Sequence, residues 1–279
     1  YSQIKSFTFG PKVETIPAYL CRNMSNISAP IVIPESVTSI GSEAFYYCSS
    51  IPSLTLNKTI KNYNREFDGC SGLKSVYYTG TIEEWCGITF NNSSSNPLNY
   101  AKNLYINNNL ATEIDIPSSI TSIGAYQFQG ATCLTKVTLP STITSVGADA
   151  FYGCTNLESI NLGATGTTKV SNNAFYGCSK LAAIEFPNSI TTIGSSALYG
   201  CSSLRKVVFG ENLTSVGSDA LRYCYTLDTI VWNVKTYSIA SSSSTPFYSS
   251  YVSVYSQIKS FTFGPKVETI PAYLCRNMS

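Results

Sequence analysis

A segment of about 23 residues recurs along this chain of 279 residues. Most copies carry a large apolar residue that is followed three positions later by Cys, as in "SVGADAFYGC" and "TIGSSALYGC". The apolar residue returns at steps of 23, 24, 23 and 23, at Phe128, Phe151, Phe175, Leu198 and Leu221. A period of this length is typical of solenoids, in which each repeat forms one coil. The repeat therefore predicts a stack of coils.

The first half of a coil has the pattern of a short β-strand. In "LTKVTLP", residues 134–140, Val137 and Leu139 alternate with polar residues, as in a strand that buries one face. A Pro or Gly follows at the same place in other coils, and Pro marks the end of strand pairing because it cannot donate to a ladder. We expect one strand per coil, stacked in parallel.

The second half of a coil predicts a turn. In "SVGADAFYGC", Val146 points inward, Gly147 turns the chain, about one helical turn runs through Phe151, and Gly153 adopts a left-handed conformation. A coil cannot be stable alone, since ordering costs about 1–2 kcal/mol per residue and each buried anchor returns roughly 1.5–3 kcal/mol. Neighbouring coils must supply the stability.

The anchors predict one continuous solenoid over residues 1–279. Its coils start near residues 4, 27, 51, 73, 110, 134, 157, 181, 204, 227 and 258. Two coils are long and carry insertions at 79–109 and 233–254, each with a serine run followed by Pro. Serine runs predict flexible polar loops, with lateral docking sites as the alternative.

Residues 255–279 repeat residues 1–25 letter for letter. Other coils resemble one another only at their anchors, so this identity indicates duplication. Neither end of the pattern carries the polar cap that a solenoid needs. We expect a molecule that continues in both directions, as a tandem array of 254-residue units or as units docked end to end. An overlap added when the chain was made is the competing explanation.

The segments "IPESVTSIGSEAFYYCSS" and "LPSTITSVGADAFYGCTNL" resemble the BspA-type, or treponemal-type, leucine-rich repeats of bacterial and some protist surface proteins. The resemblance covers nearly the whole chain. It implies a leucine-rich-repeat solenoid of about eleven right-handed coils, with a parallel β-sheet on one face and short helical or 3-10 turns on the other. It also implies a surface protein involved in attachment. Residues 60–67 and the two long coils depart from the repeat.

Composition argues against several function classes. The chain contains no histidine, which removes the commonest general base and a favoured metal ligand. Only 12% of residues are charged and the net charge is +2, so no basic field predicts a nucleic-acid partner. Apolar runs are too short to span a membrane in this segment. We expect no enzyme and no cofactor; a signal peptide and an anchor would lie outside this segment.

The outward positions of the strands form the exposed face of the predicted sheet. This face bears mostly hydroxyl groups and has no aromatic platform for a sugar or a base, so we expect a broad protein-binding surface. The candidate interaction surface comprises Glu113, Asp115, Lys136, Thr138, Ser159, Asn161, Glu185 and Lys206.

Tyrosines follow the apolar anchor in three successive coils, and an arginine takes the same column in the next coil. The column predicts either half-buried stacking or a contact patch for another protein, with a cation–π contact between Tyr199 and Arg222. The candidate lateral contact joins this column with the tryptophans of the two long coils: Tyr152, Tyr176, Tyr199, Arg222, Trp85 and Trp232.

Six cysteines recur in register and predict a buried thiol ladder of small apolar side chains. The ladder comprises Cys48, Cys70, Cys154, Cys178, Cys201 and Cys224. Neighbouring coils place Cα atoms about 4.8 Å apart, which a disulfide can span, so the redox state stays open. Cys86 and Cys133 lie off the ladder and are expected to be more exposed.

These features favour a non-enzymatic extracellular or cell-surface repeat protein that mediates adhesion or protein–protein interaction. Its partners would be host matrix or cell-surface proteins. The alternative is a structural filament built from tandem or end-to-end stacked 254-residue units, whose partners are other copies of the chain.

Overall fold

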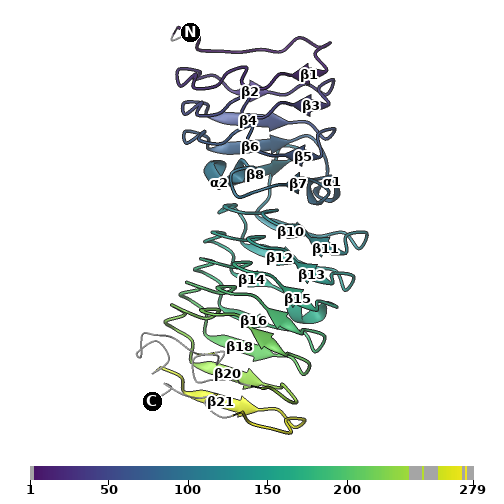
Figure 1. Ribbon diagram of the computed structural model, residues 1–279, viewed down its shortest axis with the longest axis vertical. Coiled ribbons are helices and arrows are strands. Elements are labelled where there is room, and N and C mark those ends of the chain that lie inside the picture. Colours follow the sequence, from purple (N-terminus) through teal and green to yellow (C-terminus); the bar gives the residue numbers. More distant parts are fainter. Residues whose placement is uncertain (1–2, 239–246, 248–256, 272–273, 275–279) are drawn as a thin grey trace. The chain divides into compact units, whose positions relative to one another are not determined.

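The structure is a computed structural model that describes residues 3–238, 247, 257–271 and 274 (Figure 1). Short strands stack in parallel, with little helix, so the predicted solenoid is confirmed and the number of coils roughly agrees. The chain groups into two compact units, which are treated separately below. Unit 1 comprises Tyr1–Thr112 with Gly124–Cys133, and unit 2 comprises Glu113–Ile123 with Leu134–Ser279. That all coils form one continuous solenoid stays a prediction.

The main sheet of unit 1 takes one strand from each coil. Its strands are β2 (Ile31–Val32), β4 (Ser53–Leu56), β6 (Ser75–Tyr78) and β8 (Asn103–Ile106), with β9 (Asn109–Leu110) antiparallel to β8. In β4 the side chains of Leu54 and Leu56 are buried while those of Ser53 and Thr55 are half-buried. This alternation is what the strand pattern predicts, because successive side chains point to opposite faces.

Unit 2 holds two main sheets. The first joins β10 (Glu113–Asp115), β12 (Lys136–Thr138) and β14 (Ser159–Ile160), and the second joins β16 (Ala183–Glu185), β18 (Lys206–Phe209), β20 (Thr229–Trp232) and β21 (Ser260–Phe263). A 3-10 turn, η1 (Leu162–Ala164), follows β14 where the sheet is interrupted. At this interruption the sheet face of unit 2 is hollowed, as described below.

A second set of two-residue strands precedes the turns. In unit 1, β1 (Thr15–Ile16) pairs with β3 (Ser39–Ile40), and β5 (Asn62–Tyr63) pairs with β7 (Thr89–Phe90). In unit 2 the stack is β11 (Ser122–Ile123), β13 (Ser145–Val146), β15 (Lys169–Val170), β17 (Thr192–Ile193) and β19 (Ser215–Val216). The repeat pattern predicted only turns on this side, because two residues are too few for a strand period to be recognised.

The turns of successive coils hydrogen-bond in one direction. The N–H groups of Asp149, Phe151 and Gly153 each donate to a carbonyl of the following coil, at 3.0, 2.8 and 2.7 Å. Asp149 and Gly153 have positive φ values of 55° and 69°, which confirms the left-handed conformation predicted for the glycine. The same donation recurs at Phe45 in unit 1 and at Phe175 in unit 2. We call this series of turns the turn column.

The first insertion, 79–109, consists largely of helices and strands, which complete the long coil that begins with β6, rather than of a flexible loop alone. It contains α1 (Ile82–Cys86), β7, α2 (Leu98–Ala101) and β8, and β8 pairs in parallel with β6. Within its serine run Ser95 is buried, and its hydroxyl donates to the carbonyl of Asn64 at 3.2 Å. Much of the second insertion, 239–246 and 248–254, lies outside the described residues.

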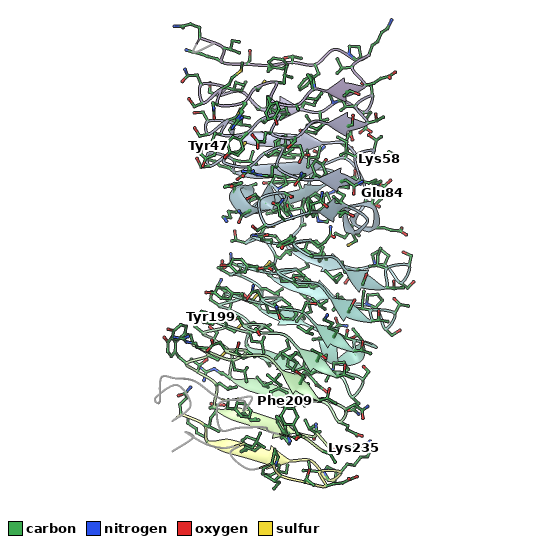
Figure 2. All side chains as sticks on the ribbon, in the orientation of Figure 1. Tyr47, Lys58, Glu84, Tyr199, Phe209 and Lys235 are labelled. Carbon is green, nitrogen blue, oxygen red and sulfur yellow. The ribbon has the colours of Figure 1, made fainter. Side chains whose placement is uncertain are left out.

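The tryptophans of both insertions are fully buried, so their assignment as lateral contacts is wrong. The Trp85 indole N–H donates to the carbonyl of Gln127 at 3.1 Å, and its ring meets Tyr78 edge-on. Trp232 packs against Phe209 with ring centroids 5.1 Å apart, and Phe209 lies among interior side chains (Figure 2). A large ring fills the wider interior of a long coil, and its burial removes more apolar surface from water than contact at an edge.

Candidate interaction surfaces

A hollow of about 650 Å³ opens on the sheet face of unit 2. It lies where β14 ends and η1 begins, between the two main sheets of this unit. Its lining is largely apolar and includes Ile160 and Ile184, and the cation of Lys206 also lines it. An apolar hollow with a few charged groups around it is the usual form of a binding site.

Small residues create this hollow. Ala164 and Ala183 line the hollow with short side chains, which leave its space unfilled. A Cβ added to Gly163 would lie 2.8 Å from Cγ of Glu185, so the glycine allows the Glu185 side chain to lie against the η1 turn. Larger residues at these positions would fill the hollow.

Four of the eight residues predicted for the interaction surface line the hollow: Ser159, Asn161, Glu185 and Lys206. The other four lie on β10 and β12 and do not line it: Glu113, Asp115, Lys136 and Thr138. Lys136 and Glu113 form an ion pair at 3.6 Å whose side chains are 55% and 66% exposed, so it contributes little stability.

Asn161 also has a structural role. Its side-chain amide donates to the carbonyl of Leu139 at 3.0 Å and accepts from the Leu139 N–H at 2.6 Å, so it extends the ladder beside β12. Gly163, Ala164 and Ala183 were not among the residues predicted for the interaction surface. The sequence signal for the hollow was a local excess of small residues, in "LGATG" and "LAAIE". The prediction relied instead on the charged and hydroxyl residues of the same face.

The tyrosine column of unit 2 is a half-buried stack at the edge of the coils (Figure 2). Tyr152 and Tyr176 lie 4.7 Å apart with rings 11° from parallel, and Tyr176 and Tyr199 lie 4.5 Å apart at 7°. The Arg222 guanidinium lies 5.8 Å from the Tyr199 ring centroid, as predicted, and 4.8 Å from that of Tyr223. Whether this column also meets another protein stays a prediction.

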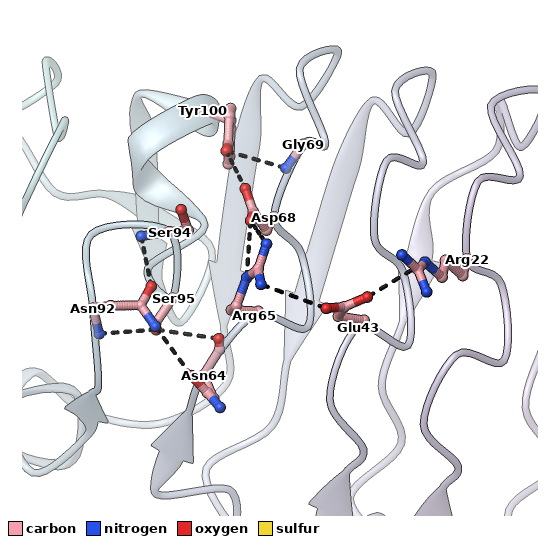
Figure 3. A network of polar contacts seen from close by, with 10 residues as sticks. All are labelled: Arg22, Glu43, Asn64, Arg65, Asp68, Gly69, Asn92, Ser94, Ser95 and Tyr100. Carbon is pink, nitrogen blue, oxygen red and sulfur yellow. Dashed lines mark hydrogen bonds and ion pairs between the residues drawn. The ribbon is translucent and has the colours of Figure 1, made fainter.

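Unit 1 carries a network of charged side chains at its turns (Figure 3). Glu43 pairs with Arg22 at 3.3 Å and with Arg65 at 3.5 Å, and Arg65 pairs with Asp68 at 3.1 Å. The two guanidinium groups lie 5.2 and 5.3 Å from the ring centroid of Tyr46. The sequence did not reveal this network, because unlike residues occupy these turn positions from coil to coil.

The six ladder cysteines are buried free thiols. Thiols donate to the anchor carbonyl of the preceding coil, for example Cys178 to Phe151 at 3.3 Å and Cys70 to Phe45 at 3.2 Å. Desolvation raises the pKa of Cys178 well above its usual value. Cys86 and Cys133 are half-buried, and burial raises the pKa of Cys86 to about 12. At Cys178 and Cys86 burial thus opposes the thiolate form, which is the nucleophilic form of cysteine.

Within the described ranges, no three or more His, Cys, Asp or Glu side chains are grouped so that they could hold a metal ion. The helices of the same ranges are all too short or too polar to cross a membrane.

Stacked coils with a parallel sheet define a leucine-rich-repeat solenoid, a class whose extended surfaces bind proteins in general. The family model for the BspA type leucine rich repeat region (6 copies) matches residues 1–111, 101–228 and 168–279. The chain belongs to this family.

Solved structures of other repeat proteins resemble this fold. A leucine-rich repeat protein from Bacteroides ovatus is 21% identical, with a TM-score of 0.57, over 95% of this chain and 68% of that one. The leucine rich repeat protein of T. pallidum is 26% identical, with a TM-score of 0.47, over 58% of this chain and 71% of that one. No curated protein sequence matches the chain.

Proposed function

We propose that this chain is a non-enzymatic protein of the cell surface or extracellular space that binds other proteins through the sheet face of unit 2. The observation that carries the proposal is the hollow beside η1, whose largely apolar lining includes the Lys206 cation and the Glu185 carboxylate. Such a site suits a protein segment that presents a small apolar side chain flanked by charged groups. The family, whose repeats resemble those of surface proteins, supports the location and a role in adhesion.

Binding to matrix proteins and to cells tests this proposal. We expect saturable binding that Ala183→Trp, which fills the hollow, and Lys206→Glu, which reverses its cation, each weaken about tenfold or more, as loss of a central contact does. Matched controls are Ser215→Trp on β19 and Lys169→Glu on β15, exposed positions of the other stack of strands. No saturable binding, or equal loss in the controls, would contradict the proposal.

A second candidate function is a structural filament of 254-residue units. Its support is the identity of residues 255–279 with residues 1–25, together with the pairing of β21 on β20 as an ordinary further coil. Electron microscopy of native material tests it: long continuous particles are expected, and short particles with free ends would exclude it.

A further inference from the structure

The sheet face of unit 1 carries a row of side chains that crosses all five strands of its main sheet. Residues that pair in register on neighbouring strands point to the same face of a sheet. The register therefore aligns one residue from each of β2, β4, β6 and β8 (Figure 1) and one from β9. We call these five residues the outer row: Val32, Thr55, Tyr77, Tyr105 and Leu110.

The outer row is largely apolar and reaches the surface. The rings of Tyr77 and Tyr105 stack with their centroids 4.5 Å apart and their planes 18° from parallel, and both side chains are half-buried. At the two ends of the row, Val32 is 55% exposed and Leu110 is 41% exposed. The expectation of a sheet face without an aromatic platform is therefore wrong for unit 1. Tyr105 lies in the insertion 79–109, where no repeated phrase marks the outward positions.

A polar row without charge runs beside the outer row. Ser53 pairs with Ser75, which pairs with Asn103, and all three are half-buried. Lys74 and Lys102 immediately precede the last two of these residues, and both lysines are exposed. Lys74 joins none of the ion pairs in the described residues. The face thus combines an uncharged apolar row with a cationic margin.

The chemistry of this face restricts the partner that it can hold. The strands already bond to one another, so a chain that lies across them gains no ladder of its own. The N–H groups of such a chain would lose water above the outer row without gaining acceptors, which is unfavourable. Proline has no N–H, and a polyproline II helix has no internal hydrogen bonds. Its carbonyls can instead accept hydrogen bonds from tyrosine hydroxyls.

The repeat of a polyproline II helix also matches the spacing of the strands. The helix turns once in three residues, which is roughly 9.3 Å, and two strand spacings measure about 9.6 Å. Every third residue of the helix can therefore meet every second strand. Val32, Tyr77 and Leu110 stand two strands apart in this way. The whole row spans about 19 Å, or roughly six residues of such a helix.

We propose that the outer row binds an extended proline-rich segment of another protein, whose acidic residues face Lys74 and Lys102. Prolines of the segment pack against the edges of the stacked tyrosine rings, and Val32 and Leu110 contact the turns before and after them. Aromatic surfaces recur in the recognition of polyproline II helices. This site lies in unit 1, so it is separate from the hollow of unit 2 and goes beyond the function proposed above.

The probe for this site is a blocked peptide of four Pro-Pro-Glu units, whose acidic residues recur along one edge of the helix. We expect saturable binding to the full chain by isothermal titration calorimetry, in the micromolar range. A Gly-Gly-Glu peptide of the same length and charge should bind at least about tenfold more weakly, because it lacks the proline rings and loses more conformational entropy on binding.

Substitutions in the outer row should weaken the binding of this peptide. Tyr77→Ala removes a ring of the stack, and Val32→Glu adds a charge to the row, so each should reduce the affinity about tenfold or more. Tyr47→Ala is the matched control, because it removes an exposed tyrosine from a turn of the same unit. This control should leave the affinity unchanged.

Reversal of a charge at the margin tests the acidic part of the proposal. Lys74→Glu should weaken binding of the Pro-Pro-Glu peptide and strengthen binding of a Pro-Pro-Lys peptide. Lys61→Glu makes the same charge change at an exposed position before β5, in the other stack of strands. At physiological salt it should alter either affinity by less than about threefold, because distant charges are screened.

Three results would overturn the inference. The first is equal affinity for the Pro-Pro-Glu and Gly-Gly-Glu peptides. The second is unchanged affinity in Tyr77→Ala and Val32→Glu variants whose fold is verified by circular dichroism. The third is a loss of peptide binding in Ala183→Trp, which would place the peptide in the hollow of unit 2. If Ala183→Trp weakens binding to matrix proteins and leaves the peptide bound, the two sites are independent.

Discussion

The Cys201 thiol donates a hydrogen bond to the carbonyl oxygen of Phe175 in the preceding coil, 3.2 Å away. Cys224 repeats the contact on Leu198 at 3.2 Å. Only a reduced cysteine can donate in this way, because a disulfide sulfur carries no hydrogen. The ladder therefore contributes to the fold as thiols, which the spacing of the cysteines could not decide.

Alkaline pH should destabilise the protein through this ladder. Desolvation raises the pKa of Cys201 well above the ordinary value of 9.0 and that of Cys70 to about 12. Above pH 9 the unfolded chain loses these protons while the folded chain keeps them, so the free energy of unfolding falls, by up to about 1.4 kcal/mol per pH unit for each thiol. Urea denaturation from pH 8 to 11 measures the slope.

The double variant Cys178→Ala with Cys201→Ala measures how much of the pH dependence of the free energy of unfolding comes from the ladder. These substitutions should lower stability at pH 7 and flatten its fall above pH 9. An unchanged slope would show that other groups cause the alkaline loss.

Trp85→Ala should lower the free energy of unfolding by about 3–5 kcal/mol, the cost of removing a large buried ring. The indole has no exposed surface and its N–H donates to Gln127. Tyr105→Ala, at a half-buried position of β8, should cost less. Chemical denaturation followed by circular dichroism checks both. A neutral Trp85 variant would restore the lateral-contact interpretation.

The tyrosine stack should show measurable coupling between neighbours. A double-mutant cycle of Tyr176→Leu and Tyr199→Leu should give about 0.5–1.5 kcal/mol, as expected for stacked rings. The pair Tyr152 and Tyr199, separated by Tyr176, serves as the control and should be additive within about 0.5 kcal/mol. Equal coupling in both pairs would indicate that the substitutions disrupt the structure of the turn column as a whole and not one ring contact.

Asn57→Ala should cost about 1–3 kcal/mol, because it leaves buried backbone groups without partners. The Asn57 amide donates to the carbonyl of Val37 at 2.8 Å and accepts from the Thr59 N–H at 3.1 Å. Asn212→Ala, which removes an exposed amide, is the control and should be nearly neutral. Thermal denaturation compares the two variants; equal losses would show that burial of Asn57 is not the cause.

The sequence predicted the coil, its strand and its left-handed glycine because these depend on local chemistry that repeats. The buried anchors, such as Val137 and Phe151, recur at equivalent positions from coil to coil, so the pattern can be recognised. The sequence did not predict the helices and strands within 79–109, since this insertion lacks the repeated phrase. The sequence also did not predict the hollow. The hollow exists because Gly163 and Ala183 have little or no side chain, and single small residues produce no periodic pattern.

The turn column makes the interface between coils directional. The N–H groups of Phe151 and Gly153 donate to the following coil, whereas those of Thr144 and Gly147 donate to the preceding coil. The two sets of bonds run in opposite senses, so their peptide dipoles partly cancel, as in sheets generally. Each interface nevertheless has a fixed pattern of donors and acceptors, and a coil turned end for end would set donors against donors.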